Sequence, residues 1–191
     1  MRRACVVMGL DLSLSGAGVA VIRTDWNCDM NNVHVYRFGY GLHSKDTNGQ
    51  IQRLAYLRDQ ILDVAKIENV THVFVEDYAF SMNFRAHQMG EVGGVIRLAC
   101  YERGLPIVAV ACNTARKTFF GEGERLKGKE AKQFIKSSLE KLGVSWSSRK
   151  TEFDREDAFV IANHGLALLH SKHITIVRSQ SRRKRGKSKA V

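Results

Sequence analysis

The order of hydrophobic and polar positions predicts a group of strands, followed by helices that alternate with strands. Three short runs near the start are apolar or alternate in polarity, as strands do: residues 5–12, 18–23 and 33–38. A Ser/Gly turn joins the first two runs and favours an antiparallel hairpin. Apolar residues at helical spacing predict a helix over residues 51–67, with Asn48-Gly49 marking the break before it.

The rest of the chain continues with two more strands and several helices. A continuous β-branched and aromatic run at residues 72–75 is typical of a buried strand, and residues 105–110 predict another. Helices are predicted over residues 85–101, 114–120, 129–142 and 153–170, with a short extra strand at 174–177. This order predicts an α/β fold whose five-stranded mixed sheet is an antiparallel meander followed by parallel strands, with helices on both faces.

The net charge of the chain predicts a polyanionic binding partner. The formal net charge is +11, a balance that most often indicates nucleic acid binding. Seven basic residues and no acid follow residue 177, so the domain expected at residues 1–177 carries only roughly +4. We expect residues 178–191 to be a disordered tail that binds DNA through Arg182, Arg183, Lys184 and Arg185. A solubilising end or a localisation signal is the alternative.

The cysteine spacing and the hydropathy exclude other classes of protein. The four cysteines form no C-x-x-C pair, which is typical of a reduced intracellular protein without zinc. No stretch is long and apolar enough to predict a membrane span.

Several acidic residues lie beside apolar segments, at positions that folding alone does not favour. Asp11 and Glu76 each end an apolar strand, and the carboxyl ends of parallel strands face one crevice, where ligands usually bind. Asp154 and Asp157 share one face of the last predicted helix. Taken singly, each strand-end acid is also explained as a loop residue or a helix cap, and the pair as a favourable first turn.

The strongly apolar segment at residues 158–169 predicts a deeply packed helix, whose first turn would bring its acids to the strand ends. Four carboxylates in one crevice repel one another unless cations are bound. Carboxylate oxygens suit Mg²⁺ or Mn²⁺, and two ions about 3.5–4 Å apart can hold both oxygens of a phosphoryl displacement. Basic residues around a Gly-x-Gly turn are expected to contact DNA, although a solvated helix end also explains them: Arg116, Lys117, Arg125, Lys127 and Lys129.

Four segments together resemble the motifs of a known family. They are MGLDLSLSGAGVA at 8–20, VFVE at 73–76, RKTFFGEG at 116–123 followed by Lys129, and DREDA at 154–158. In this order and at these intervals they resemble the RuvC-type Holliday junction resolvases over about residues 6–170. A phage member of that family is one form that the resemblance allows. The resemblance implies an RNase H-like fold.

The resemblance also implies an activity. Asp11, Glu76, Asp154 and Asp157 would be the catalytic ligands of two Mg²⁺ ions, with Mn²⁺ as a substitute. Lys117 and Lys129 would contact phosphates. A homodimer would make paired symmetric nicks in four-way junctions and leave 5′ phosphates, without a nucleotide cofactor or a membrane. The location implied is the cytoplasm of a bacterial or phage-infected cell, at the nucleoid.

Some positions depart from the family pattern or have two explanations. Strict spacing puts Ala79 where the family stacks an aromatic residue on a base, so Tyr78 or Phe80 would have to substitute. Glycines in the central helix at 90, 93 and 94 fit either the family's dimer contact or tight packing on the sheet. We expect His164 to be a packed residue and not a ligand.

Other functions stay open at this point. The chain is also compatible with a YqgF-like nuclease that acts on RNA or other branched nucleic acid. A non-catalytic nucleic-acid-binding protein of the same fold is a further alternative, in which the acids are structural. An actin-like ATPase shares the opening hairpin but has no use for the Asp154–Asp157 pair.

Overall fold

A computed structural model describes residues 5–13, 16–24, 30–39, 46–77, 86–121, 128–144 and 155–170. Its strands form one five-stranded sheet in the order β3-β2-β1-β4-β5. Their bounds are β1 Cys5–Ser13, β2 Gly16–Thr24, β3 Met30–Gly39, β4 His72–Glu76 and β5 Ile107–Val110. β1, β2 and β3 pair antiparallel, whereas β4 is parallel to both β1 and β5. The predicted meander followed by parallel strands is confirmed.

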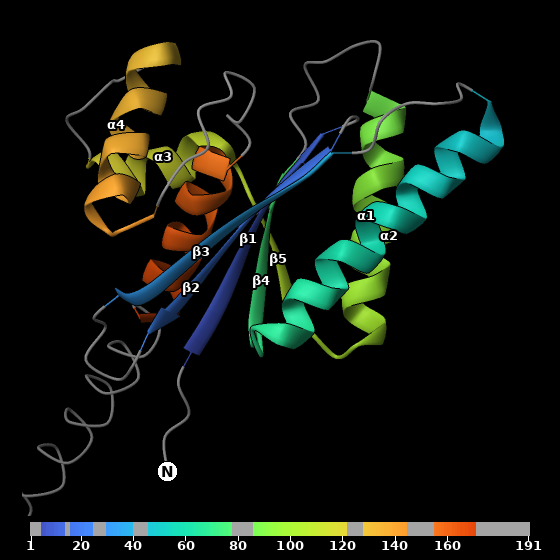
Figure 1. The fold of residues 1–191 in the computed structure, drawn as a ribbon, viewed down its shortest axis with the longest axis horizontal. Coiled ribbons are helices and arrows are strands. Elements are labelled where there is room, and N and C mark those ends of the chain that lie inside the picture. Colours follow the sequence, from blue (N-terminus) through green and yellow to red (C-terminus); the bar gives the residue numbers. More distant parts are fainter. Residues whose placement is uncertain are drawn as a thin grey trace, which may run out of the picture.

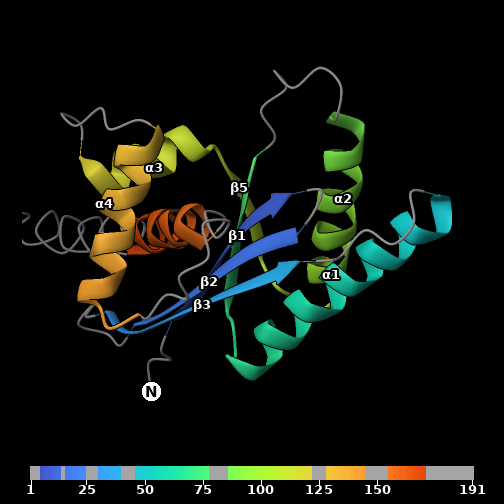
Figure 2. The ribbon, with the colours of Figure 1, turned by 45° about the horizontal axis from the view of Figure 1, so that its top comes forward.

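Helices cover both faces of the sheet, as predicted (Figures 1 and 2). One face packs on α1 (Thr47–Ile67) and α2 (Ala86–Glu102), which supply buried residues such as Leu57 and Ile96. The other face packs on α3 (Cys112–Phe120), α4 (Gly128–Lys141) and a helix of residues 155–170. No helix in the described part of the chain has the length and apolar character needed to cross a membrane.

The start of α1 corrects one expectation. Asn48-Gly49, predicted as a break, lie inside the first turn of the helix. Asp46 caps this turn, because its Oδ1 accepts a hydrogen bond of 2.7 Å from the Gly49 backbone N–H. The cap provides an acceptor that outweighs the low helix propensity of Asn and Gly. The short strand predicted at residues 174–177 lies outside the described residues.

Glycine lets the 155–170 helix lie directly on the sheet. A Cβ added at Gly9 in β1 would collide with the backbone of Ala158 and Ala162, and one added at Gly165 would collide with the ring of Phe74. The helix is apolar on nearly all sides, and residues 158–162 are each at most 1% exposed. Its position against β1 is therefore fixed by backbone contact, which flexible side chains cannot relax.

Candidate functional site

Asp11 and Glu76 lie on one face of the sheet, at neighbouring positions of two adjacent strands. The parallel register pairs Leu10 of β1 with Val75 of β4, and each acid follows by one residue. Side chains alternate between faces, so Asp11 shares a face with Gly9, and Glu76 shares it with Phe74. This is the face covered by the 155–170 helix. Glu76 ends β4 as predicted, whereas β1 continues for two residues beyond Asp11 because it pairs with β2 as far as Ser13.

Asp157 enters the same region from the first turn of the 155–170 helix. It is 7% exposed, immediately before the residues that pack on β1. Asp154, the fourth predicted acid, lies outside the described residues. A buried carboxylate needs compensating partners, because transfer of a charge from water is costly.

The thiol of Cys112 lies beside the carboxylate of Asp157. Cys112 is the first residue of α3, directly after β5, and its Sγ lies 3.8 Å from Asp157 Oδ1. The pKa of this thiol is raised to about 12, mainly by burial, with the charges of Asp157, Glu76 and Asp11 adding to the effect and that of Arg116 opposing it. One side chain therefore interacts electrostatically with all three carboxylates.

Two cations contact Asp157. The Arg116 guanidinium donates to Oδ1 from Nη2 at 2.6 Å and from Nε at 3.2 Å. Lys132 Nζ lies 3.7 Å from Oδ2. Burial lowers the pKa of Arg116, but the hydrogen bonds and charge of Asp157 outweigh it, with a smaller contribution from Glu76, so the pKa is raised. Arg116 stays charged beside the acids.

The other predicted DNA-binding residues fall into two groups. Lys117 and Lys129 are exposed on α3 and α4. Their predicted phosphate contacts stay predictions. The remaining positions lie outside the described residues: Tyr78, Phe80, Arg125, Lys127, Arg182, Arg183, Lys184 and Arg185.

Several functional neighbours were not predicted. Cys112 had a usable signal, since it follows the carboxyl end of a parallel strand. Lys132 had a weaker signal, its position three residues after Lys129 on one helix face. Glu156 is 3% exposed and its Oε2 has no hydrogen-bond partner in the described part of the protein. Burial raises the pKa of Glu156, with the charge of Asp157 adding to it against Lys132 and Lys136.

Two expectations about packing are resolved. His164 is buried, and its Nδ1 lies 2.7 Å from Thr118 Oγ1, so it joins the 155–170 helix to α3 as a packed residue. Gly93 is buried in α2, whereas Gly90 and Gly94 are exposed and an added Cβ would meet no atom within 4 Å. Tight packing on the sheet therefore does not explain Gly90 and Gly94.

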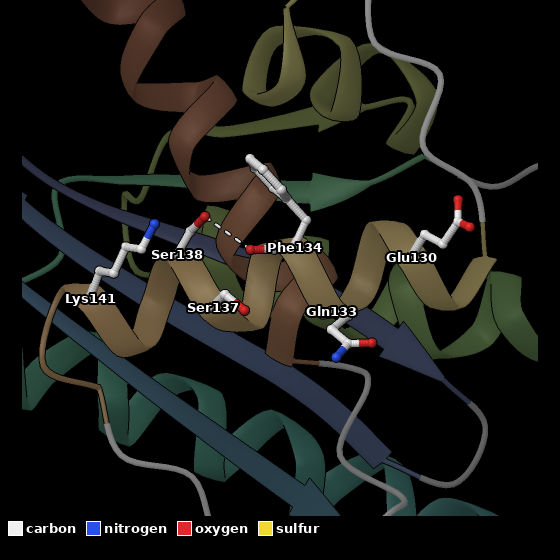
Figure 3. Close-up of a pocket in the computed structure, with 6 residues that line it drawn as sticks. All are labelled: Glu130, Gln133, Phe134, Ser137, Ser138 and Lys141. Atoms are coloured by element: carbon white, nitrogen blue, oxygen red, sulfur yellow. Dashed lines mark hydrogen bonds between the residues drawn. The ribbon is translucent and has the colours of Figure 1, made fainter.

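A hollow on α4 is separate from the acids. Among the described residues, its lining comes from that helix: Glu130, Gln133, Phe134, Ser137, Ser138 and Lys141 (Figure 3). Ser138 Oγ donates to the Phe134 carbonyl oxygen at 2.9 Å within the helix. The three described acids, Asp11, Glu76 and Asp157, do not line this hollow.

The chemistry of the acids fits a hard divalent cation, because carboxylate oxygens are the ligands that Mg²⁺ and Mn²⁺ prefer. Among the described residues, no three His, Cys, Asp or Glu side chains are close enough together to hold one ion. The Asp157 oxygens instead contact Arg116 and Lys132. Ion binding would need Asp157 to exchange these partners.

No protein-family model and no curated protein matches the chain by sequence. Solved structures match its fold. RuvC of Thermus thermophilus aligns with a TM-score of 0.66 and 20% identity over 87% of this chain and 96% of that one. The T. thermophilus RuvC in complex with Holliday junction substrate aligns with a TM-score of 0.63 and 18% identity, again over 87% of this chain and 96% of that one. A fowlpox virus resolvase in complex with substrate Holliday junction DNA aligns with a TM-score of 0.52 and 10% identity over 86% of this chain and 98% of that one. The chain therefore has the RNase H-like fold of RuvC-type resolvases.

Proposed function

We propose that this protein is a metal-dependent endonuclease that cuts branched DNA, above all four-way junctions, by paired symmetric nicks. The observation that carries the proposal is the position of Asp11 and Glu76 on the face of the sheet that the 155–170 helix covers, with Asp157 in the first turn of that helix. Such a cluster destabilises a fold unless cations offset its charge. The likeness in fold to proteins solved with junction DNA supports the choice of substrate.

Asp11, Glu76 and Asp157, with Asp154, would hold two divalent cations. When bound, these cations supply Lewis acidity that promotes hydrolysis of a phosphodiester bond. The protein contributes the positions of the carboxylates, which the β1–β4 pairing and the contact of Gly9 with the 155–170 helix determine. Rigid positions matter because a shift of about 1 Å in a catalytic group can lower a rate by about a hundredfold.

Basic residues near the acids would bind the DNA backbone. Arg116 borders the acids, while Lys117 and Lys129 are exposed on neighbouring helices. Phosphate contacts hold the duplex arms in place without reading sequence, so we expect affinity to fall steeply as salt is added.

Paired nicks require two active sites, and hence a two-fold dimer. The exposed Gly90 and Gly94 of α2 offer a surface where another helix can approach closely. Light scattering on the purified protein tests this part, with a mass of twice 21.5 kDa expected.

Cleavage of a labelled four-way junction in a Mg²⁺ titration tests the proposal. We expect symmetric nicks that disappear in EDTA and in the Asp11→Asn and Glu76→Gln variants. Asp77→Asn is the matched control, because Asp77 is the next acid in the chain but its side chain is 55% exposed. Its Oδ1 lies 3.8 Å from Arg97 Nη2.

Each alternative function predicts a different outcome. Cleavage by Asp11→Asn would refute the metal-cluster assignment. Equal cleavage of a linear duplex would refute junction selectivity but would still support nuclease activity. Preference for RNA would favour a YqgF-like activity, and binding without cleavage at any Mg²⁺ concentration would favour a non-catalytic protein.

A further inference from the structure

The two oxygens of Asp157 contact cations that come from two different helices. Arg116 of α3 binds Oδ1 through two nitrogens, at 2.6 and 3.2 Å, and Lys132 of α4 lies 3.7 Å from Oδ2. We call these three residues the Asp157 ion-pair cluster. Because the cluster links α3, α4 and the 155–170 helix, it determines where the Asp157 carboxylate points.

These contacts are stronger than ordinary surface ion pairs. The Asp157 side chain is 10% exposed, against 29% for Arg116 and 27% for Lys132. Partial burial reduces screening by water, and hydrogen bonds between two ionised groups are about twice as strong as those between neutral groups. Removing one partner also leaves the carboxylate partly uncompensated.

A divalent cation needs the oxygens that the cluster occupies. A metal ligand must direct oxygen lone pairs at the ion, and the closest lone pairs on Oδ1 already accept from Arg116. A guanidinium beside the site also repels an incoming cation. The same two residues therefore hold the side chain of Asp157 in place and oppose its use as a ligand.

We infer that Arg116 and Lys132 compete with the divalent cation for Asp157, so that metal binding requires displacement of the Arg116 guanidinium. This inference rests on the proposed function, since it takes Asp157 as a metal ligand. A DNA phosphate accepts the same two-nitrogen contact from arginine as a carboxylate does. The displaced Arg116 then has a phosphate of the bound DNA as its partner. The cluster therefore keeps metal affinity low in the absence of substrate.

The competition predicts tighter metal binding when Arg116 is removed. Mn²⁺ affinity is measured by calorimetry on the full chain without DNA. Relief of a coupling between two bound groups typically changes affinity by about fivefold or more, so we expect Arg116→Gln to bind Mn²⁺ at least about fivefold more tightly than the wild type. Lys132→Gln, which removes the longer contact, is expected to change affinity in the same direction but less.

Lys117→Gln is the matched control for charge. It removes one positive charge from the next residue of α3, at an exposed position. We expect less than about a twofold change, because exposed charges are screened over about 10 Å in ordinary buffers. An equal gain in Lys117→Gln would show a general charge effect and overturn the inference. Unchanged or weaker binding in Arg116→Gln would overturn it as well.

Two further measurements separate this inference from the proposed function. Thermal unfolding in EDTA establishes that each variant is folded, and Arg116→Gln is expected to melt below the wild type there but to gain more stability from Mn²⁺. If the wild type cuts junctions with Mn²⁺ while Arg116→Gln shows no gain in affinity, only the competition is wrong. If Asp157→Asn binds Mn²⁺ and cuts junctions as the wild type does, Asp157 is not a ligand, and both the competition and its assignment under the proposed function are wrong.

Discussion

Replacement of Gly9 by alanine tests whether the 155–170 helix is held directly on β1. The added Cβ would collide with the Ala158 carbonyl oxygen and with the Ala162 backbone nitrogen. Backbone atoms cannot rotate away as a side chain can, so the helix itself must move. Overpacking of this kind typically costs about 1–3 kcal/mol.

Thermal unfolding in EDTA measures the effect on stability. For a chain of 150–250 residues, each kcal/mol lowers Tm by about 2–4 °C, so we expect Gly9→Ala to melt about 2–12 °C below the wild type. Gly39→Ala is the matched control, because the same methyl group added at the end of β3 meets only the Arg37 guanidinium, at 3.9 Å, which is an ordinary van der Waals contact. We expect no loss of stability there, since alanine has less conformational freedom than glycine in the unfolded chain.

Gly9→Ala should also lower cleavage at a temperature where it is fully folded. The displaced helix carries Asp157 away from Asp11, which lies two residues after Gly9 on the same face of β1. A shift of about 1 Å corresponds to about a hundredfold loss of rate. A variant that melts with the wild type and cleaves at the wild-type rate would refute the close contact and the geometry built on it.

Three further predictions concern other parts of the molecule. Burial raises the pKa of Glu68, but hydrogen bonds from Tyr36, His34 and Arg23 outweigh it, so the pKa lies below its ordinary 4.5. The ionised Glu68 carboxylate therefore contributes its full stability above pH 4.5 and loses it as the pH falls. We expect the Tm difference between the wild type and Glu68→Gln to shrink as the pH falls from about 6 to about 3. A constant Tm difference would contradict this prediction. Gly94→Ala should raise the stability of the monomer by about 0.4–1 kcal/mol in urea unfolding, and a lower stability would show a contact at that face. Deletion of the residues after 176 should weaken binding of all DNA sequences in anisotropy titrations without removing cleavage, and loss of cleavage would give the tail a place in the active site.

Much of the fold followed from local signals in the sequence. The apolar runs at residues 5–12 and 72–75 predicted β1 and β4 together with their acids Asp11 and Glu76, and the apolar segment after Asp157 predicted a deeply packed helix. The start of α1 was missed because the Asp46 cap outweighs the break expected at Asn48-Gly49.

Contacts between distant elements could not be predicted in this way. Arg116 was expected on DNA, and nothing in its neighbourhood in the chain indicates a contact with Asp157, 41 residues away. Lys132 meets the same carboxylate only because α4 packs beside the 155–170 helix. Such ion pairs depend on how helices assemble, whereas periodicity describes each element separately.

A crystal structure of the protein with Mn²⁺ tests the central claim most directly, through the anomalous scattering of the ion. We predict Mn²⁺ bound by oxygens of Asp11, Glu76 and Asp157, with the Arg116 guanidinium turned away from Asp157. Mn²⁺ bound elsewhere, with these three carboxylates keeping the partners they have here, would contradict the account.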